Sequence, residues 1–187
     1  MQLIVGLGNI GEKYKKTRHN FGFLLADKLH ENYNFGQWQA KFDGEISKGV
    51  IADFECLILK PHTFMNLSGQ AIIKAMAFYK IKPQQIIVLH DDIDIELGRI
   101  KYKIAGGNGG HNGLKSIDKM IGKNYQRLRL GVGRSKNENI DSASHVLGNF
   151  SNEELREVDK INQKISSDFQ LLLDGDANEF LNKFYIS

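Results

Sequence analysis

The sequence predicts an α/β fold, a single globular domain in which a mixed, twisted β-sheet is flanked by helices. Short apolar runs typical of strands alternate with segments of helical periodicity, and a long amphipathic helix is expected near the C-terminus. The 187 residues are 41% hydrophobic with two prolines, enough for one core, and they contain no repeat, linker or low-complexity segment. We therefore expect one domain over residues 1–187.

The expected strands are short apolar runs, several of them rich in β-branched residues. They cover residues 3–6, 44–52, 54–60, 84–91, 98–104 and 127–133. The single cysteine, Cys56, lies in one of these runs, so we expect a buried thiol and no intramolecular disulfide.

Four segments have the apolar spacing of amphipathic helices. They cover residues 20–29, 66–80, 113–122 and 151–175. Asn20 is placed to cap the first of them, and the last opens with a capping box formed by Ser151 and Glu154. The expected buried face of the second helix consists of Ile72, Ile73, Met76, Phe78 and Tyr79.

Composition excludes several classes of protein. No run of about 18 uncharged apolar residues is present, and the first residues lack the basic head and apolar segment of a secretion signal. We therefore expect a soluble, cytoplasmic protein.

Residues 6–11, GLGNIG, match the pattern G-x-G-x-x-G of dinucleotide-binding folds. In those folds a helix opens directly from the glycines, so that its amides bind a pyrophosphate. Here the charged segment EKYKKTR follows, and the helical pattern begins only near Asn20. We therefore favour a tight turn over a nucleotide site.

Charge is distributed unevenly along the chain. Residues 99–136 contain ten basic residues and one acidic residue, whereas residues 138–187 contain four basic and ten acidic residues. A solvated face is one explanation of the cationic stretch, but so concentrated an excess favours a polyanionic partner.

Polar residues gather where the expected strands end and helices begin, which is where open α/β sheets bind ligands. A histidine paired with a carboxylate can take a proton from water, and side-chain amides can stabilise an oxyanion. The residues in question are Asn9, His19, Asn20, Asn66, His90, Asp91 and the glycine-rich loop 106–113 with His111 and Asn112.

Each of these residues also has a local explanation, such as a helix cap for Asn66 or a loop donor for His111. A metal site built from His90, Asp91 and His111 is disfavoured, because no ligand pair has i, i+4 spacing and no cysteine is near. A serine nucleophile is disfavoured as well, because the sequence has no G-x-S-x-G elbow.

Taken in order, six segments resemble the signature motifs of bacterial peptidyl-tRNA hydrolases. They are VGLGNIG, TRHNFGF, KPHTFMNLSGQA, HDDIDIELGRIKYK, GGNGGHNGLKSI and RLRLGVGR, and they span residues 5–134. The resemblance implies a monomeric enzyme that cleaves the ester between a nascent peptide and the 3′ ribose of tRNA, without a metal or another cofactor.

The same resemblance implies roles for individual residues. His19 falls on the family's catalytic base and Asp91 on its orienting partner. The residues implied in substrate binding are Asn9, Tyr14, Phe64, Met65, Asn66 and Asn112. Candidates for contacts with tRNA phosphates are Lys101, Lys103, Lys115, Arg127, Arg129 and Arg134, of which we expect Lys101, Lys103, Arg129 and Arg134 to bind tRNA.

The chain departs from the family pattern at one motif. The family usually has proline where this sequence has Ile10, so we expect a looser turn around Asn9. A plant organellar branch of similar sequence assists splicing without catalysis, so a non-catalytic RNA-binding protein is the alternative. Retention of His19, Asp91 and all three asparagines favours the enzyme.

Overall fold

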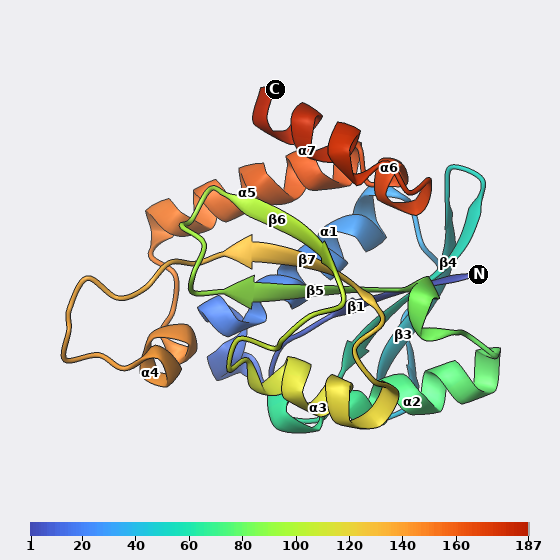
Figure 1. The fold of residues 1–187 in the computed structure, drawn as a ribbon, viewed down its shortest axis with the longest axis horizontal. Coiled ribbons are helices and arrows are strands. Elements are labelled where there is room, and N and C mark those ends of the chain that lie inside the picture. The colour runs from blue at the N-terminus through green and yellow to red at the C-terminus, as the bar shows by residue number, and fades with distance from the viewer. Residues whose placement is uncertain (187) are drawn as a thin grey trace.

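A seven-stranded mixed sheet forms the centre of the molecule (Figure 1). The computed structural model describes residues 1–186. The strands are β1 (Gln2–Gly6), β2 (Gln39–Lys41), β3 (Gly44–Ile51), β4 (Phe54–Pro61), β5 (Ile86–Asp92), β6 (Ile100–Ile104) and β7 (Gln126–Gly131). In space they follow the order β2-β3-β4-β1-β5-β7-β6. The central strands β4, β1, β5 and β7 are parallel, and the outer strands pair antiparallel with their neighbours.

Helices cover both faces of this sheet (Figure 1). On one face lie α1 (Phe21–Asn32), α5 (Asn152–Ser167), α6 (Gln170–Leu173) and α7 (Ala177–Ile186), and on the other lie α2 (Ser68–Tyr79) and α3 (Asn112–Ile121). The short helix α4 (Ser142–Leu147) lies beyond the carboxyl ends of the parallel strands. The predicted α/β class is confirmed.

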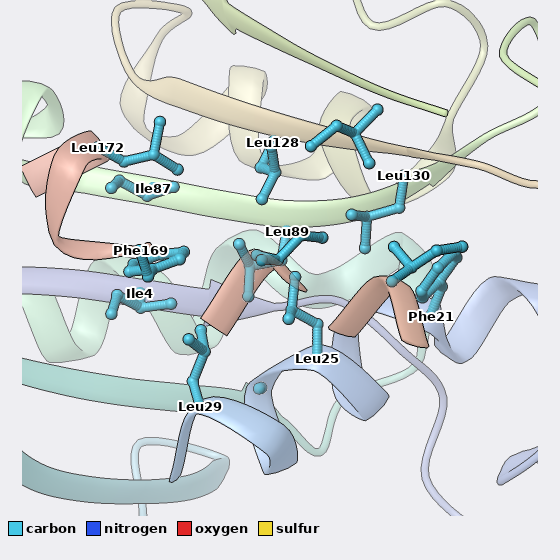
Figure 2. Close-up of a cluster of buried hydrophobic side chains, with 14 of the residues drawn as sticks. Ile4, Phe21, Leu25, Leu29, Ile87, Leu89, Leu128, Leu130, Phe169 and Leu172 are labelled. Carbon is cyan, nitrogen blue, oxygen red and sulfur yellow. The ribbon is translucent and has the colours of Figure 1, made fainter. Parts of the chain in front are cut away.

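Two hydrophobic clusters, one on each face, hold the layers together. Ile4 of β1 packs toward α1 and α5, whereas its neighbours Leu3 and Val5 pack toward α2 and α3. Figure 2 shows the first cluster, in which Ile4, Ile87 and Leu89 meet Leu25 and Leu29 of α1. Central parallel strands are buried on both faces, and for this reason their sequences are continuous apolar runs.

The glycines of GLGNIG serve packing and a turn. A Cβ added to Gly6 would lie 2.5 Å from the carbonyl oxygen of Gly22, and one on Gly22 would lie 2.3 Å from that of Leu89. Strand β1 and helix α1 can therefore approach closely only because both positions lack a side chain. Gly11 has a φ of 117°, which is the tight turn expected. Two 3₁₀ turns separate it from α1, so the helix does not open from the glycines as a dinucleotide site requires.

Most expected elements are present, with ends shifted by a few residues, and Cys56 is fully buried in β4. The buried face predicted for α2 is partly wrong, because Ala71, Ile72 and Ala75 face the core while Ile73 and Phe78 are exposed. Asn20 precedes α1, but its side chain does not cap the helix.

The long C-terminal helix is shorter than predicted. Helix α5 begins with the expected capping box but ends at Ser167, and α6 follows after a break at Asp168. The hydroxyl of Tyr33, the residue that follows α1, donates to the carbonyl oxygen of Ser166 at 2.6 Å, and so takes an acceptor that a continuing helix would use. Packing against α1 therefore overrides the local helical pattern.

Candidate active site

The predicted histidine and carboxylate meet beyond the carboxyl ends of β1 and β5. His19 lies in the 3₁₀ turn Arg18–Asn20 that leads into α1, and Asp91 lies near the end of β5. His19 Nδ1 is 2.8 Å from Asp91 Oδ1, and both side chains are buried. Among residues 1–186 no group bonds to His19 Nε2, so this nitrogen remains available to a ligand.

A second histidine binds the same carboxylate oxygen. His111 Nε2 lies 2.9 Å from Asp91 Oδ1. Its Nδ1 caps α3 by accepting from the amides of Gly113 and Leu114, at 3.1 and 3.4 Å. This network assigns the proton to Nε2, so His111 donates to Asp91. Sequence reasoning placed His111 in the candidate site cluster, as a loop donor or a disfavoured metal ligand, but did not predict its hydrogen bond to Asp91; its position just before a helical pattern was the available signal.

Burial and hydrogen bonding shift two ionisations at the site. Burial alone would raise the pKa of the Asp91 carboxyl, but the charges and hydrogen bonds of His19 and His111 outweigh it and hold this pKa well below its ordinary value. Burial lowers the pKa of His90 to about 3, and His111 adds to the shift. His90 donates from Nδ1 to the main-chain oxygen of Asp91 at 2.8 Å. Asp91 is therefore ionised and His90 neutral.

The three side chains that come together as potential metal ligands are His19, Asp91 and His111, with ligand atoms within 4.8 Å of one another. His111 fits a metal poorly, because the nitrogen that faces the group carries the proton. A metal at Nε2 would move that proton to Nδ1, against the two amide hydrogens already there. The arrangement is suited to a proton network.

Asn9, Asn66 and Asn112 line a cavity together with His19, and a fourth asparagine, Asn20, holds Asn9 in place. The amide N–H of Asn9 donates to Asn20 Oδ1 at 2.8 Å, and its carbonyl accepts from Asn20 Nδ2 at 3.0 Å. Asn9 Oδ1 accepts from the amide of Met65 at 2.9 Å, so the NH₂ group of Asn9 is left for a ligand. Asn20 thus fixes the main chain of the turn at Asn9. Ile10, which stands where the family usually has proline, is the next residue and is exposed. Asn66 and Asn112 are exposed.

Two adjoining cavities open around these residues. The smaller has a volume of about 230 Å³ and the larger about 610 Å³, and both are lined by His19 and Asn112. Five predicted substrate-binding residues line the smaller cavity: Asn9, Phe64, Met65, Asn66 and Asn112. Tyr14 lies outside both linings. Helix α4, which the sequence did not predict, contributes Ala143, Val146 and Leu147 to the smaller cavity.

The larger cavity has charged walls of both signs. Its basic lining residues are Lys103, Arg127, Arg129 and Arg134, and its acidic ones are Asp91, Asp92 and Asp94, whereas Lys101 lies outside the lining. Arg129 Nε is 2.8 Å from Asp92 Oδ2, and an Arg134 nitrogen is 2.6 Å from Asp94 Oδ1. Lys103 has no carboxylate within ion-pair distance in the part of the chain that the structure describes.

Arg127 has a different place from the other cations. Its side chain is buried and donates to the carbonyl oxygens of Gly107 and Gly106, at 2.7 and 3.1 Å, and to Asp118 Oδ1 of α3 at 3.1 Å. The guanidinium therefore ties the glycine-rich loop to α3. Arg127 borders the larger cavity, but its side chain is only 2% exposed and its hydrogen bonds go to the loop and to α3.

Comparisons with known proteins agree on one family. The family model described as peptidyl-tRNA hydrolase matches residues 3–187. A peptidyl-tRNA hydrolase of Rickettsia canadensis is 47% identical over 98% of this chain and 99% of its own length, and one of Rickettsia peacockii is 48% identical over 97% of this chain and 100% of its own.

Solved structures agree with the sequence comparison. The crystal structure of peptidyl-tRNA hydrolase from Acinetobacter baumannii superposes with a TM-score of 0.90 at 37% identity, and the match covers 98% of this chain and 94% of that one. Sequence, fold and the order of the motifs thus coincide over nearly the whole chain. The chain belongs to the peptidyl-tRNA hydrolase family.

Proposed function

We propose that this protein hydrolyses the ester of peptidyl-tRNA, with His19 as the general base. The observation that supports this most strongly is the His19–Asp91 pair at the junction of the two cavities. The Asp91 carboxylate is the hydrogen-bond partner of His19 Nδ1, so the nitrogen with a lone pair available to accept a proton is Nε2. Family membership supplies the substrate class.

Asp91 holds the proton of His19 on Nδ1, and Nε2 removes a proton from water. The resulting hydroxide attacks the ester carbonyl and forms a tetrahedral oxyanion. The free NH₂ group of Asn9 is suited to stabilise this charge, and Asn112 lies on the same wall. The imidazolium then returns its proton to the ribose oxygen as the ester bond breaks, which gives a peptide carboxylate and free tRNA.

The two cavities divide the substrate by chemistry. The smaller cavity presents Phe64, Met65, Val146 and Leu147, and is suited to a peptide. The larger presents Lys103, Arg129 and Arg134, and is suited to phosphates of the tRNA. The ester then lies at their junction, next to His19. Lys101 faces the same side of the sheet and is proposed as an outer phosphate contact.

The working form is proposed as a cytoplasmic monomer without a metal, as the resemblance to the family implies. Among the described residues no helix is long and apolar enough to cross a membrane.

Incubation with a labelled N-blocked aminoacyl-tRNA, with and without a chelator, tests the proposal. We expect release of the labelled acyl-amino acid at the same rate in both samples. Activity that disappears with chelator and returns with zinc would contradict the metal-free mechanism. Binding of tRNA without release of label would indicate a non-catalytic RNA-binding protein.

A further inference from the structure

Two carboxylates, Asp92 and Asp94, already hold cations in the larger cavity. Asp92 ends β5 and Asp94 lies in the turn that follows, and each pairs with an arginine from β7 or the loop after it. A phosphate that enters this cavity therefore meets arginines with an anion already bound. The two carboxylates differ in how firmly they are held.

Asp92 is part of the local structure. Its Oδ1 accepts from the amide of Asp94 at 2.9 Å while its Oδ2 accepts from Arg129, and the side chain is 13% exposed. Among residues 1–186, Arg134 is the one partner of the Asp94 carboxylate, and the side chains of Asp94 and Arg134 are 54% and 64% exposed. An exposed pair of this kind is weak, so another anion can displace the carboxylate at little cost.

We propose that Asp94 is a resident anion that competes with tRNA phosphate for Arg134 and so limits the affinity for tRNA. This inference rests on the proposed function, because it requires a phosphate at the larger cavity. When tRNA is absent, Asp94 holds Arg134 across the mouth of the cavity. When a phosphate binds Arg134, Asp94 is released to solvent.

The consequence concerns product as well as substrate. The tRNA body is common to both, so a contact with its phosphates strengthens binding of product as much as binding of substrate. A carboxylate that recaptures Arg134 weakens both equally and favours release of tRNA after hydrolysis. Asp94 therefore lowers the affinity for the tRNA body, whether or not a peptide is attached to it.

The test is an Asp94→Asn variant, with Glu96→Gln as the matched control. Glu96 is an exposed acid of the same segment, and its side chain is in no ion pair of the described chain. We expect Asp94→Asn to bind deacylated tRNA about two- to fivefold more tightly, as the range measured for exposed pairs implies, and to show stronger product inhibition. Glu96→Gln should change the Kd less. Equal gains in both variants would overturn the inference, since they would reflect net charge alone.

A double-mutant cycle with Arg134→Met decides the point, with hydrolysis of labelled substrate followed in parallel. If Asp94 acts through Arg134, Asp94→Asn should give no gain in the Arg134→Met background. If Asp94→Asn raises tRNA affinity equally in both backgrounds, or in neither, and the protein still hydrolyses its substrate, the inference is overturned and the proposed function stands. If Arg134→Met binds tRNA as well as wild type, Arg134 touches no phosphate and the inference also fails. Loss of the proposed function would be seen separately, as absence of hydrolysis by the unmodified protein.

Discussion

At the residue scale, the site depends on one carboxylate oxygen that accepts from two histidines. His111 donates from a nitrogen whose protonation is fixed by the helix amides behind it, and it bonds the same Asp91 oxygen as His19, with the centroids of the two imidazole rings 4.8 Å apart. In the proposed mechanism Asp91 in turn orients His19. The geometry of this network is thus set by residues from three elements far apart in the sequence.

The first prediction concerns Asp91→Asn. An amide retains the size of the side chain but can present its NH₂ group to His19 Nδ1, which favours the wrong tautomer. We expect kcat/KM to fall, by less than in His19→Ala, because a misoriented imidazole is still a base. Single-turnover hydrolysis of N-blocked aminoacyl-tRNA measures this. A wild-type rate would show that Asp91 does not orient the base.

The second prediction concerns His90 and pH. The pKa of His90 is about 3 in the folded protein and about 6.5 in the unfolded chain, so the unfolded state binds more protons between these values. The free energy of unfolding should therefore decrease as pH falls from about 6, by roughly 1.4 kcal/mol per pH unit from this group alone.

His90→Asn keeps an N–H donor near the position of Nδ1 and removes the titration. Urea unfolding of both proteins at several pH values between about 4 and 6 should give a shallower decrease for the variant. The slopes are compared, because the smaller side chain also changes the absolute stability. Parallel slopes would show that His90 is not kept neutral by burial.

At the scale of elements, Arg127 of β7 joins the glycine-rich loop to α3. Arg127→Met removes this tie and leaves the buried carboxylate of Asp118 without its cation, and breaking a buried pair costs about 3–5 kcal/mol. Adding Asp118→Asn removes the unpaired charge, so the double variant should recover much of the stability in urea unfolding. We expect activity to be low in both the single and the double variant, because neither restores the hydrogen bonds that Arg127 donates to the carbonyls of Gly106 and Gly107. Additive losses in stability would contradict this account.

Features set by residues close together in the sequence could be predicted, whereas features set by packing between distant segments could not. Strands and the α/β class were accessible, because apolar runs report on nearby residues, whereas the pairing of His19 with Asp91, 72 positions apart, was accessible only through the resemblance to a family. The break at Asp168 was not, since it depends on Tyr33 more than a hundred positions earlier. The buried place of Arg127 and the second hydrogen bond to Asp91 likewise require the packing of α3 against the sheet.

At the scale of the whole molecule, charge is separated between the two faces of the sheet. The register places Lys101 opposite Arg129 and Lys103 opposite Arg127, so all four project from one face of β6 and β7. The acidic C-terminal segment forms α5, α6 and α7 on the other face (Figure 1). A polyanion is therefore directed to the face that contains the larger cavity.

The prediction at this scale is that Lys103→Glu raises KM for peptidyl-tRNA with little change in kcat, because a phosphate contact is equal in ground and transition states. The dependence of log Kd on log salt should also become shallower, by roughly 0.7 to 0.9 per lost contact. Lys160→Glu, an exposed reversal on α5, is the control and should leave the salt dependence unchanged. Equal slopes for wild type and Lys103→Glu would show that Lys103 makes no phosphate contact.

The central claim is that His19 removes the proton from water at the junction of the two cavities. It is tested most directly by comparing wild type and His19→Ala in two measurements, single-turnover hydrolysis of N-blocked aminoacyl-tRNA and the Kd for deacylated tRNA. We predict a loss of hydrolysis on the order of 100- to 10,000-fold with tRNA affinity retained, because proton abstraction and phosphate binding belong to different residues. Hydrolysis near the wild-type rate in His19→Ala would contradict the mechanism.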